Sequence, residues 1–179
     1  HVGGVVFANE EEKLSALLSL LQGIIDERKY LFAQTHCGTF PQYRAVSPTP
    51  LPAILVLIDN FAALRDHDMD AADRLTEIIS VGKTFGVYFV ITGSTKNAIH
   101  YKVTEHIASY FALKMNDPGD YLDLLKVRPP VFPEDIAGRG ITVIGKEVVE
   151  FQTAVAWDGE SEADRRMKIQ RAYQEIASK

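Results

Sequence analysis

Two short polar stretches, each directly after an apolar run, could together bind a nucleotide and its metal ion. Asp59-Asn60 follows the run 53–58, and Thr92-Gly93-Ser94 follows the run 87–91. A carboxylate held at the end of a buried strand can lie where Mg²⁺ bridges the phosphates of ATP. An Asp in this place can equally start a turn or cap a helix. The motif by itself leaves both interpretations open.

The residue after the aspartate bears on hydrolysis. Proteins that hydrolyse ATP need a side chain near this position that orients or activates the attacking water. Asn60 offers an amide, which can hydrogen-bond a water but cannot take its proton at neutral pH. The pair Asp59-Asn60 is therefore compatible with nucleotide binding and argues against efficient hydrolysis.

A phosphate-binding loop of the form G-x-x-x-x-G-K-[ST] is absent from the sequence. Gly82-Lys83-Thr84 has the right tail, but Glu77 stands where the first Gly belongs. The segment 140–146 has the right spacing, but Glu147 follows its Lys and its middle reads as a strand. We expect neither segment to wrap a phosphate.

Two other candidate ligand groups favour plainer interpretations. Asp66, Asp68 and Asp70 approach the spacing of a calcium-binding loop, but Ala71 stands where that loop needs a Gly. A solvated acidic helix start explains them better. Cys37, the single cysteine, has no partner for an intrachain disulfide and no second ligand pair for zinc.

The elements that would position the polar stretches follow from hydrophobic periodicity. The pattern predicts strands and helices in alternation, which favours an α/β fold with a mostly parallel sheet covered by helices. The unbroken apolar runs 53–58 and 87–91 indicate strands buried on both faces. In such sheets ligands bind at the carboxyl ends of the strands, where both polar stretches lie.

The remaining predicted elements surround these two strands. Asn9 and Glu12 form a capping-box pattern at the start of a helix. Asp117 before Pro118 starts another helix, and Ser161 caps a closing charged helix. The predicted strands are 2–8, 53–58, 87–91, 110–114, 141–144 and 148–153, and the predicted helices are 9–33, a helix that starts near Met69 and stops at Gly86, 97–106, one after Asp117, and 162–177.

Composition excludes several classes of protein. The chain has 179 residues and a net charge of −5, so gripping nucleic acid is not expected of it. No apolar run approaches the roughly 20 residues that a membrane span needs, so no membrane contact is expected of this segment. The chain opens without Met and without a signal-peptide pattern, and we expect it to be part of a larger protein.

Taken in order, six segments and the opening residues 1–5 resemble the FtsK/SpoIIIE-type ATPase domains of type VII secretion systems. The segments are 51–61, 79–92, 97–99, 112–114, 136–140 and 150–154. The likeness covers residues 1–155 as a partial ATPase domain and leaves 156–179 as a charged helix, expected to link to a further domain.

The resemblance implies a RecA-like P-loop NTPase fold, here truncated before the phosphate-loop unit or lacking it. It implies binding of ATP and Mg²⁺ only together with the missing phosphate loop, in a cytoplasmic domain of a membrane-anchored protein. The implied partners are other ATPase domains of the same protein, small helical secreted substrates and further copies of the chain. Without its phosphate-loop unit, the fragment is expected to have a gap or an exposed edge in its sheet.

The resemblance also assigns roles to residues. Asp59 matches the metal-side acid of the Walker B motif, and Asn60 the place of the catalytic Glu. Thr92, Gly93 and Ser94 match the sensor strand end, where related DNA translocases carry a Gln in place of Gly93. The run Gly138-Arg139-Gly140 lies where the chain returns near the nucleotide base, or it is simply a turn that leads into a strand. No residue is assigned to catalysis, and this segment alone is expected to be inactive as an ATPase.

Four functions remain open. The first is an ATP-binding, weakly hydrolysing or non-hydrolysing domain, a later and degenerate member of a tandem, that regulates a secretion motor or docks its substrates. The others are a nucleotide-independent protein-interaction module, a fragment of a DNA-translocase motor, and an unrelated doubly wound domain. Acidic charge and Asn60 speak against the translocase.

Overall fold

The computed structural model describes residues 3–177 and divides the chain into two compact units, His1–Ala108 and Ser109–Lys179. Each unit has its own hydrophobic core. The predicted domain division at residue 155 stays a prediction. No helix among the described residues is long and apolar enough to span a bilayer.

The first unit is built on two parallel strands, β1 (Ile54–Ile58) and β2 (Val87–Ile91). They pair in register, from Ile54 opposite Val87 to Ile58 opposite Ile91. The connection between them holds α3 (Phe61–His67), α4 (Met69–Gly82) and the short 3-10 turn η1 (Lys83–Phe85). Both strands were predicted from their apolar runs, and both are confirmed.

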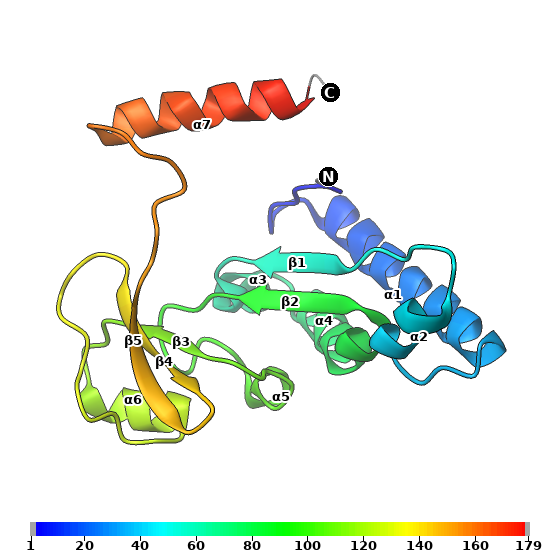
Figure 1. Cartoon of the computed structure of the whole chain (residues 1–179), viewed down its shortest axis with the longest axis horizontal. Helices are drawn as coiled ribbons and strands as arrows, with labels where there is room; N and C mark the ends of the chain where they lie inside the picture. Colours follow the sequence, from blue (N-terminus) through cyan, green and yellow to red (C-terminus); the bar gives the residue numbers. More distant parts are fainter. Residues whose placement is uncertain (1–2, 178–179) are drawn as a thin grey trace. The chain divides into compact units, whose positions relative to one another are not determined.

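Helices cover one face of this parallel pair (Figure 1). The long helix α1 (Glu11–Gln34) and α4 pack their apolar sides against the strands, as helical periodicity predicts. The strand residues that face them are Ile54, Val56, Ile58, Val87, Phe89 and Ile91.

The opposite face of β1 is not covered by the described chain. Leu55 and Leu57 are 61% and 71% exposed, and Val90 of β2 is 50% exposed. The prediction that both strands are buried on both faces is wrong here. The unbroken apolar run reflects a face that the described residues leave open. The gap or exposed edge expected of a chain without a phosphate-loop unit concerns strand pairing, and among the described residues β1 and β2 pair only with each other.

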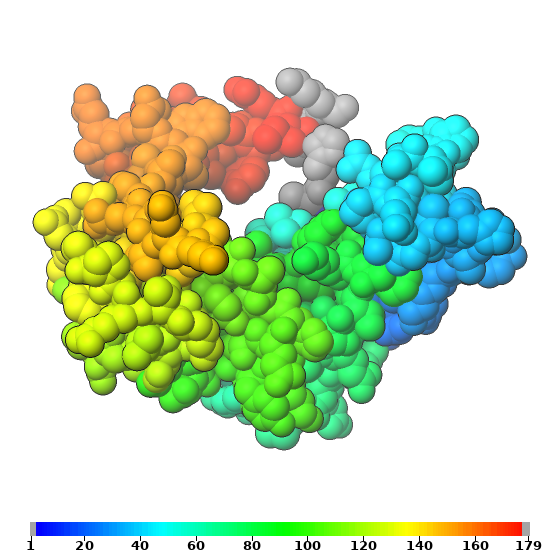
Figure 2. Space-filling model, turned by 60° about the horizontal axis from the view of Figure 1, so that its bottom comes forward, coloured from blue at the N-terminus to red at the C-terminus, as the bar shows by residue number. Residues whose placement is uncertain are grey.

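Two short helices complete the first unit. Residues 35–52, where no strand or helix was predicted, contain α2 (Phe40–Val46), whose Phe40 and Tyr43 pack against Phe32 of α1. In Figure 2 the surfaces of α1 and α2 adjoin. The predicted helix 97–106 is present as the single turn α5 (Tyr101–Thr104). The helix α3 was missed, because its polar end suggested a loop.

The start of the chain differs from the prediction. Residues 3–8 form no strand, and Val2 lies outside the described residues. The predicted capping box of Asn9 and Glu12 is also wrong, since α1 has no side-chain cap. Instead the Phe7 backbone N–H donates to the Glu10 carboxylate at 2.9 Å. This bond fixes the turn that leads into α1, and it leaves the first N–H groups of the helix without a side-chain cap.

The second unit is a three-stranded antiparallel sheet with one packed helix. Its strands β3 (Phe111–Leu113), β4 (Arg139–Ile144) and β5 (Glu147–Gln152) lie in that order. The hairpin of β4 and β5 was predicted and is confirmed. The helix α6 (Pro118–Leu125) buries Tyr121 and Leu125 against the sheet.

Two predicted helix caps in this unit are confirmed. The Asp117 carboxylate accepts from the Gly119 backbone N–H at 2.7 Å, at the start of α6. The Ser161 hydroxyl accepts from the Asp164 backbone N–H at 3.1 Å, at the start of α7 (Glu162–Ala177). The fold class is therefore α/β, as predicted. The expectation of a mostly parallel sheet holds for β1 and β2 only, because the other two strand pairings are antiparallel.

Candidate functional site

Asp59 and Thr92 meet at the carboxyl ends of β1 and β2. The Thr92 hydroxyl donates to Asp59 Oδ1 at 2.6 Å. The same hydroxyl oxygen accepts from the Asn60 backbone N–H at 2.9 Å. Since Ile58 and Ile91 are register partners, the residues that follow them are brought face to face. One threonine thus fixes the predicted metal-side acid and the residue after it.

Backbone contacts strengthen this strand-end cluster. The Thr92 N–H donates to the Ile58 carbonyl at 2.9 Å, and the Phe61 N–H donates to the Thr92 carbonyl at 3.2 Å. Asn60 takes a left-handed conformation with φ 57°, which Asn tolerates better than most residues. The chain turns sharply there, two residues after the end of β1, and α3 begins directly after Asn60.

Gly93 and Ser94 continue from the same strand end and are exposed. A Cβ on Gly93 would lie 2.8 Å from the Ala98 methyl group, so close packing of the following turn accounts for this glycine. The first unit therefore brings together Asp59, Asn60 and Thr92 through hydrogen bonds, with Gly93 and Ser94 adjoining them in the chain.

The run Gly138-Arg139-Gly140 lies in the second unit, at the start of β4. Gly138 has φ 78°, a conformation that disfavours other residues. A Cβ on Gly140 would lie 2.5 Å from the Phe151 ring. Arg139 pairs with Glu150 of β5 at 3.3 Å. The local packing explains both glycines, whereas the Arg139 Nε is buried without a hydrogen-bond partner among the described residues. The predicted place of the run beside a nucleotide base stays a prediction.

The metal chemistry of the strand-end cluster fits a nucleotide-bound ion. Among residues 3–177 no group of three or more His, Cys, Asp or Glu could hold a metal ion. Mg²⁺ in nucleotide sites is held by one or two carboxylates together with substrate phosphates. The single exposed carboxylate of Asp59 suits that role, in which the phosphates supply the remaining ligands.

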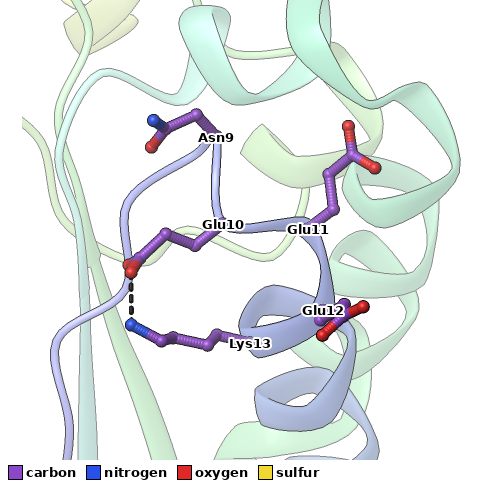
Figure 3. A pocket seen from close by; sticks show the side chains of 5 residues that line it. All are labelled: Asn9, Glu10, Glu11, Glu12 and Lys13. Atoms are coloured by element: carbon purple, nitrogen blue, oxygen red, sulfur yellow. Dashed lines mark hydrogen bonds and ion pairs between the residues drawn. The ribbon is translucent and has the colours of Figure 1, made fainter.

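A shallow hollow at the start of α1 is lined mainly by acidic residues, which lie at a helix start and not at a strand end. It is lined by Asn9, Glu10, Glu11, Glu12 and Lys13, and Figure 3 shows Glu10 paired with Lys13. The Lys13 ammonium, with the Phe7 backbone N–H, lowers the pKa of the Glu10 carboxyl. These contacts explain Glu10 as a helix-start residue.

Arg28 is a residue that the sequence motifs do not single out. It is 4% exposed, and its guanidinium donates to the carbonyls of Pro52 and Phe85. A signal for it does exist. The buried stripe of α1 runs through Leu21, Ile25 and Phe32 at helical spacing, and position 28 falls on the same stripe. A charged residue on an apolar stripe predicts a buried polar contact.

Comparison with solved structures identifies the fold. EssC (ATPases 2 and 3) from Geobacillus thermodenitrificans superposes with a TM-score of 0.84 and 21% identity, covering 94% of this chain and 32% of that chain. Thermomonospora curvata EccC (ATPases 2 and 3), solved in complex with a signal sequence peptide, gives a TM-score of 0.72 and 18% identity, covering 93% of this chain and 31% of that chain. The chain has the fold of these ATPase domains.

Comparison with curated protein sequences points to the same group of secretion ATPases as the solved structures. The chain is 24% identical over 151 residues to the ESX secretion system protein YukB of Bacillus subtilis (strain 168), covering 84% of this chain. It spans only 10% of that relative's length. No protein-family model matches the chain. Its homologues are the EssC/EccC ATPases of type VII secretion systems, of the FtsK/SpoIIIE type, and the resemblance found in the sequence is confirmed.

Proposed function

We propose that this chain is an ATP-binding domain of a type VII secretion motor, one that hydrolyses ATP weakly or not at all and that regulates the motor or docks its substrates. The observation that carries the proposal is the contact of Asp59 with Thr92, with Asn60 beside it. The likeness to type VII secretion ATPases supports the same assignment.

The residues of the cluster have distinct roles in this proposal. Asp59 holds the Mg²⁺ that accompanies ATP, and the Thr92 hydroxyl fixes the direction of its carboxylate by donating to Oδ1. Asn60 can hold a water by hydrogen bonding but cannot accept its proton. Binding is therefore separated from hydrolysis. The phosphate-binding loop comes from residues outside this chain.

The proposed partners follow from the relatives. These are tandem ATPase domains, and one was solved with a signal sequence peptide bound. We place this chain beside other ATPase domains of one membrane-anchored protein, on its cytoplasmic side. Its ligands there are small helical secreted substrates, and further copies of the protein complete the assembly.

A second candidate function is a protein-interaction module that uses no nucleotide. The observation that favours it is the open apolar face of β1, where Leu55 and Leu57 are mostly exposed. Exposed apolar patches of this kind mark interaction surfaces. A DNA-translocase role is disfavoured by the net charge of −5.

Calorimetry of ATP–Mg²⁺ binding tests the first proposal. We would compare this chain with a version extended upstream by about 60 residues, the size of one strand–loop–helix–strand unit. We expect binding in the extended protein, weakened by Asp59→Ala at least about tenfold, or about 1.4 kcal/mol. Asp73→Ala, which removes an exposed carboxylate of α4 outside the cluster, is the matched control and should leave binding unchanged.

The other outcomes are equally informative. Absence of binding in the extended protein would overturn the nucleotide proposal and leave the interaction module as the better account. Equal weakening by both substitutions would show that Asp59 has no special part in binding.

A further inference from the structure

The buried guanidinium of Arg28 joins the starts of the two parallel strands. Its Nη1 donates to the Phe85 carbonyl at 2.6 Å, and its Nη2 donates to the Pro52 carbonyl at 2.7 Å. Phe85 lies two residues before β2, and Pro52 lies two residues before β1. A single side chain of α1 therefore bridges both strand entries. These lie at the end of the pair opposite to Asp59 and Thr92, which follow the last residues of the two strands; Figure 1 shows the two strands running in the same direction.

The surroundings of Arg28 hold it in this place. The ring of Phe40 lies 5.5 Å from the guanidinium carbon, within cation–π range. The same ring packs against Gly86, where a Cβ would lie 2.5 Å from it. Gly86 in turn accepts the first bond of the strand pair, from the Ile54 N–H at 2.9 Å. Arg28, Phe40 and Gly86 thus form one packed group, which we name the strand-start clamp.

Burying the guanidinium charge of Arg28 costs free energy unless hydrogen bonds offset the loss of water. Burial lowers the pKa of Arg28, and the neighbouring Glu27 opposes this change. Arg remains charged in proteins, so the buried charge must be satisfied by hydrogen bonds. Among residues 3–177 its guanidinium pairs with backbone carbonyls and with no carboxylate. Its partners are therefore parts of the backbone whose positions it can fix.

The strands themselves specify their register only weakly. In an ordinary half-buried strand, a slip of one residue would expose apolar side chains, and the alternating pattern prevents it. Every residue of β1 (ILVLI) and β2 (VYFVI) is apolar or aromatic, so a slipped pair would still bury apolar groups. Polar contacts at the strand ends must then fix the register.

We propose that Arg28 is a positioning residue for the nucleotide site, because it locks the starts of β1 and β2 and so sets Asp59 opposite Thr92. The contact of Asp59 with Thr92 requires that Ile58 lie opposite Ile91. A change of register would carry the carboxylate away from the hydroxyl. The consequence for ATP binding rests on the function proposed above, while the consequence for the strand pair does not.

Hydrogen exchange measured by NMR on this chain tests the strand pair directly. Three amides report on the far end, those of Asn60, Phe61 and Thr92, which donate to Thr92 Oγ1, the Thr92 carbonyl and the Ile58 carbonyl. The test variant is Arg28→Lys, which keeps the charge but loses the planar fork that spans two carbonyls. The matched control is Ile25→Val, one turn away on the same buried stripe. Exchange rates of the two variants are compared under conditions in which their free energies of unfolding are equal.

We expect Arg28→Lys to speed exchange at the three reporter amides about tenfold more than at helical amides of α4, because the far end opens without global unfolding. Ile25→Val should change the exchange rates of the reporter amides and of the α4 amides by the same factor, set by the loss of global stability. Arg28→Met should have a larger effect than Arg28→Lys. If Arg28→Met does not fold, Arg28→Lys alone decides. The proposal would be overturned if Arg28→Lys, like Ile25→Val, changed the exchange rates of the reporter amides and of the α4 amides by the same factor. Arg28 would then be a core residue only.

Calorimetry on the upstream-extended protein separates this proposal from the function it rests on. We expect Arg28→Lys to weaken ATP–Mg²⁺ binding about tenfold while Ile25→Val leaves it unchanged. If the unsubstituted protein binds no ATP, the proposed function fails but the exchange result still tests Arg28. If ATP binds and Arg28→Lys leaves both its affinity and the reporter amides unchanged, the positioning role fails and the proposed function stands.

Discussion

The cluster at Asp59 and the run Gly138-Arg139-Gly140 were both predicted to contact a nucleotide, but they differ in what explains their residues. In the run, a left-handed turn and a close ring account for the two glycines, and Arg139 forms an ion pair with Glu150 of the neighbouring strand. In the cluster, the exposed carboxylate of Asp59 is oriented by a hydroxyl from another strand.

A residue whose identity follows from local packing offers no independent sign of a ligand. An exposed polar side chain held in one direction by a partner 33 positions away has no such explanation, since solvent alone would satisfy it. The cluster is thus the stronger candidate for a ligand site, and two substitutions and one change of pH test its difference from the run.

Gly140→Ala should have the largest effect. The new methyl group would lie 2.5 Å from the Phe151 ring and 2.7 Å from the Ala112 carbonyl, so the sheet must shift. We expect the free energy of unfolding of the second unit to fall by about 1–3 kcal/mol, measured by urea denaturation with NMR signals of that unit.

The same change at Gly23 of α1 is the control, because a Cβ there meets no atom within 4 Å. It should raise stability by about 0.5–1 kcal/mol. If Gly140→Ala left stability intact and weakened ATP binding by the extended protein, the run would be a ligand contact after all and the comparison would fail.

Thr92→Val should have a smaller effect on stability. The substitution keeps the shape but removes the hydroxyl that donates to Asp59 and accepts from the Asn60 N–H. Because water can replace these bonds at an exposed site, we expect a loss of about 1 kcal/mol in denaturation. ATP affinity of the extended protein should fall.

Thr76→Val in α4, where the hydroxyl donates to the Ala72 carbonyl of the same helix, serves as the comparison variant. Equal ATP affinity in both variants would show that the direction of the Asp59 carboxylate is unimportant.

Lowering the pH should have the smallest effect of the three, a local loosening at the start of α7. The Asp164 pKa is lowered, chiefly by its hydrogen bond with Lys168, and its carboxylate also accepts from the Glu160 N–H. A lowered folded-state pKa means that this contribution is present above the ordinary value of 3.8 and is lost as pH falls through the folded value. We expect NMR shifts of residues 160–164 to report fraying of the helix start below about pH 4.

Asp164→Asn should abolish most of that pH dependence. A titration confined to α7 would sharpen the contrast between an aspartate that serves its own helix and Asp59, which joins two strands. A response that persisted unchanged in Asp164→Asn would assign the effect to other carboxylates.

Periodicity and caps predicted much of this fold because their causes are local. The strands β1 and β2, the hairpin of β4 and β5, and the helix caps at Asp117 and Ser161 depend on neighbours within a few residues. The strand-end position of Asp59 and Thr92 followed from the same reasoning, since parallel strands bring their carboxyl ends to one edge.

The failures share the opposite cause. The open face of Leu55 and Leu57 depends on what packs against it, which the strand sequence cannot specify. The role of Arg28 depends on carbonyls 24 and 57 positions away. Contacts at such distances leave only an indirect mark in the sequence, here a charge on an apolar stripe.

The connection between β1 and β2 has a consequence for the order of folding. The hairpin of β4 and β5 turns within two residues and can form in microseconds, whereas a parallel pair must wait for its whole crossover to fold. Loop closure must precede any gain from the contact of Asp59 with Thr92. We therefore expect the strand-end contacts of Asp59 to form late, after the local turns of the chain.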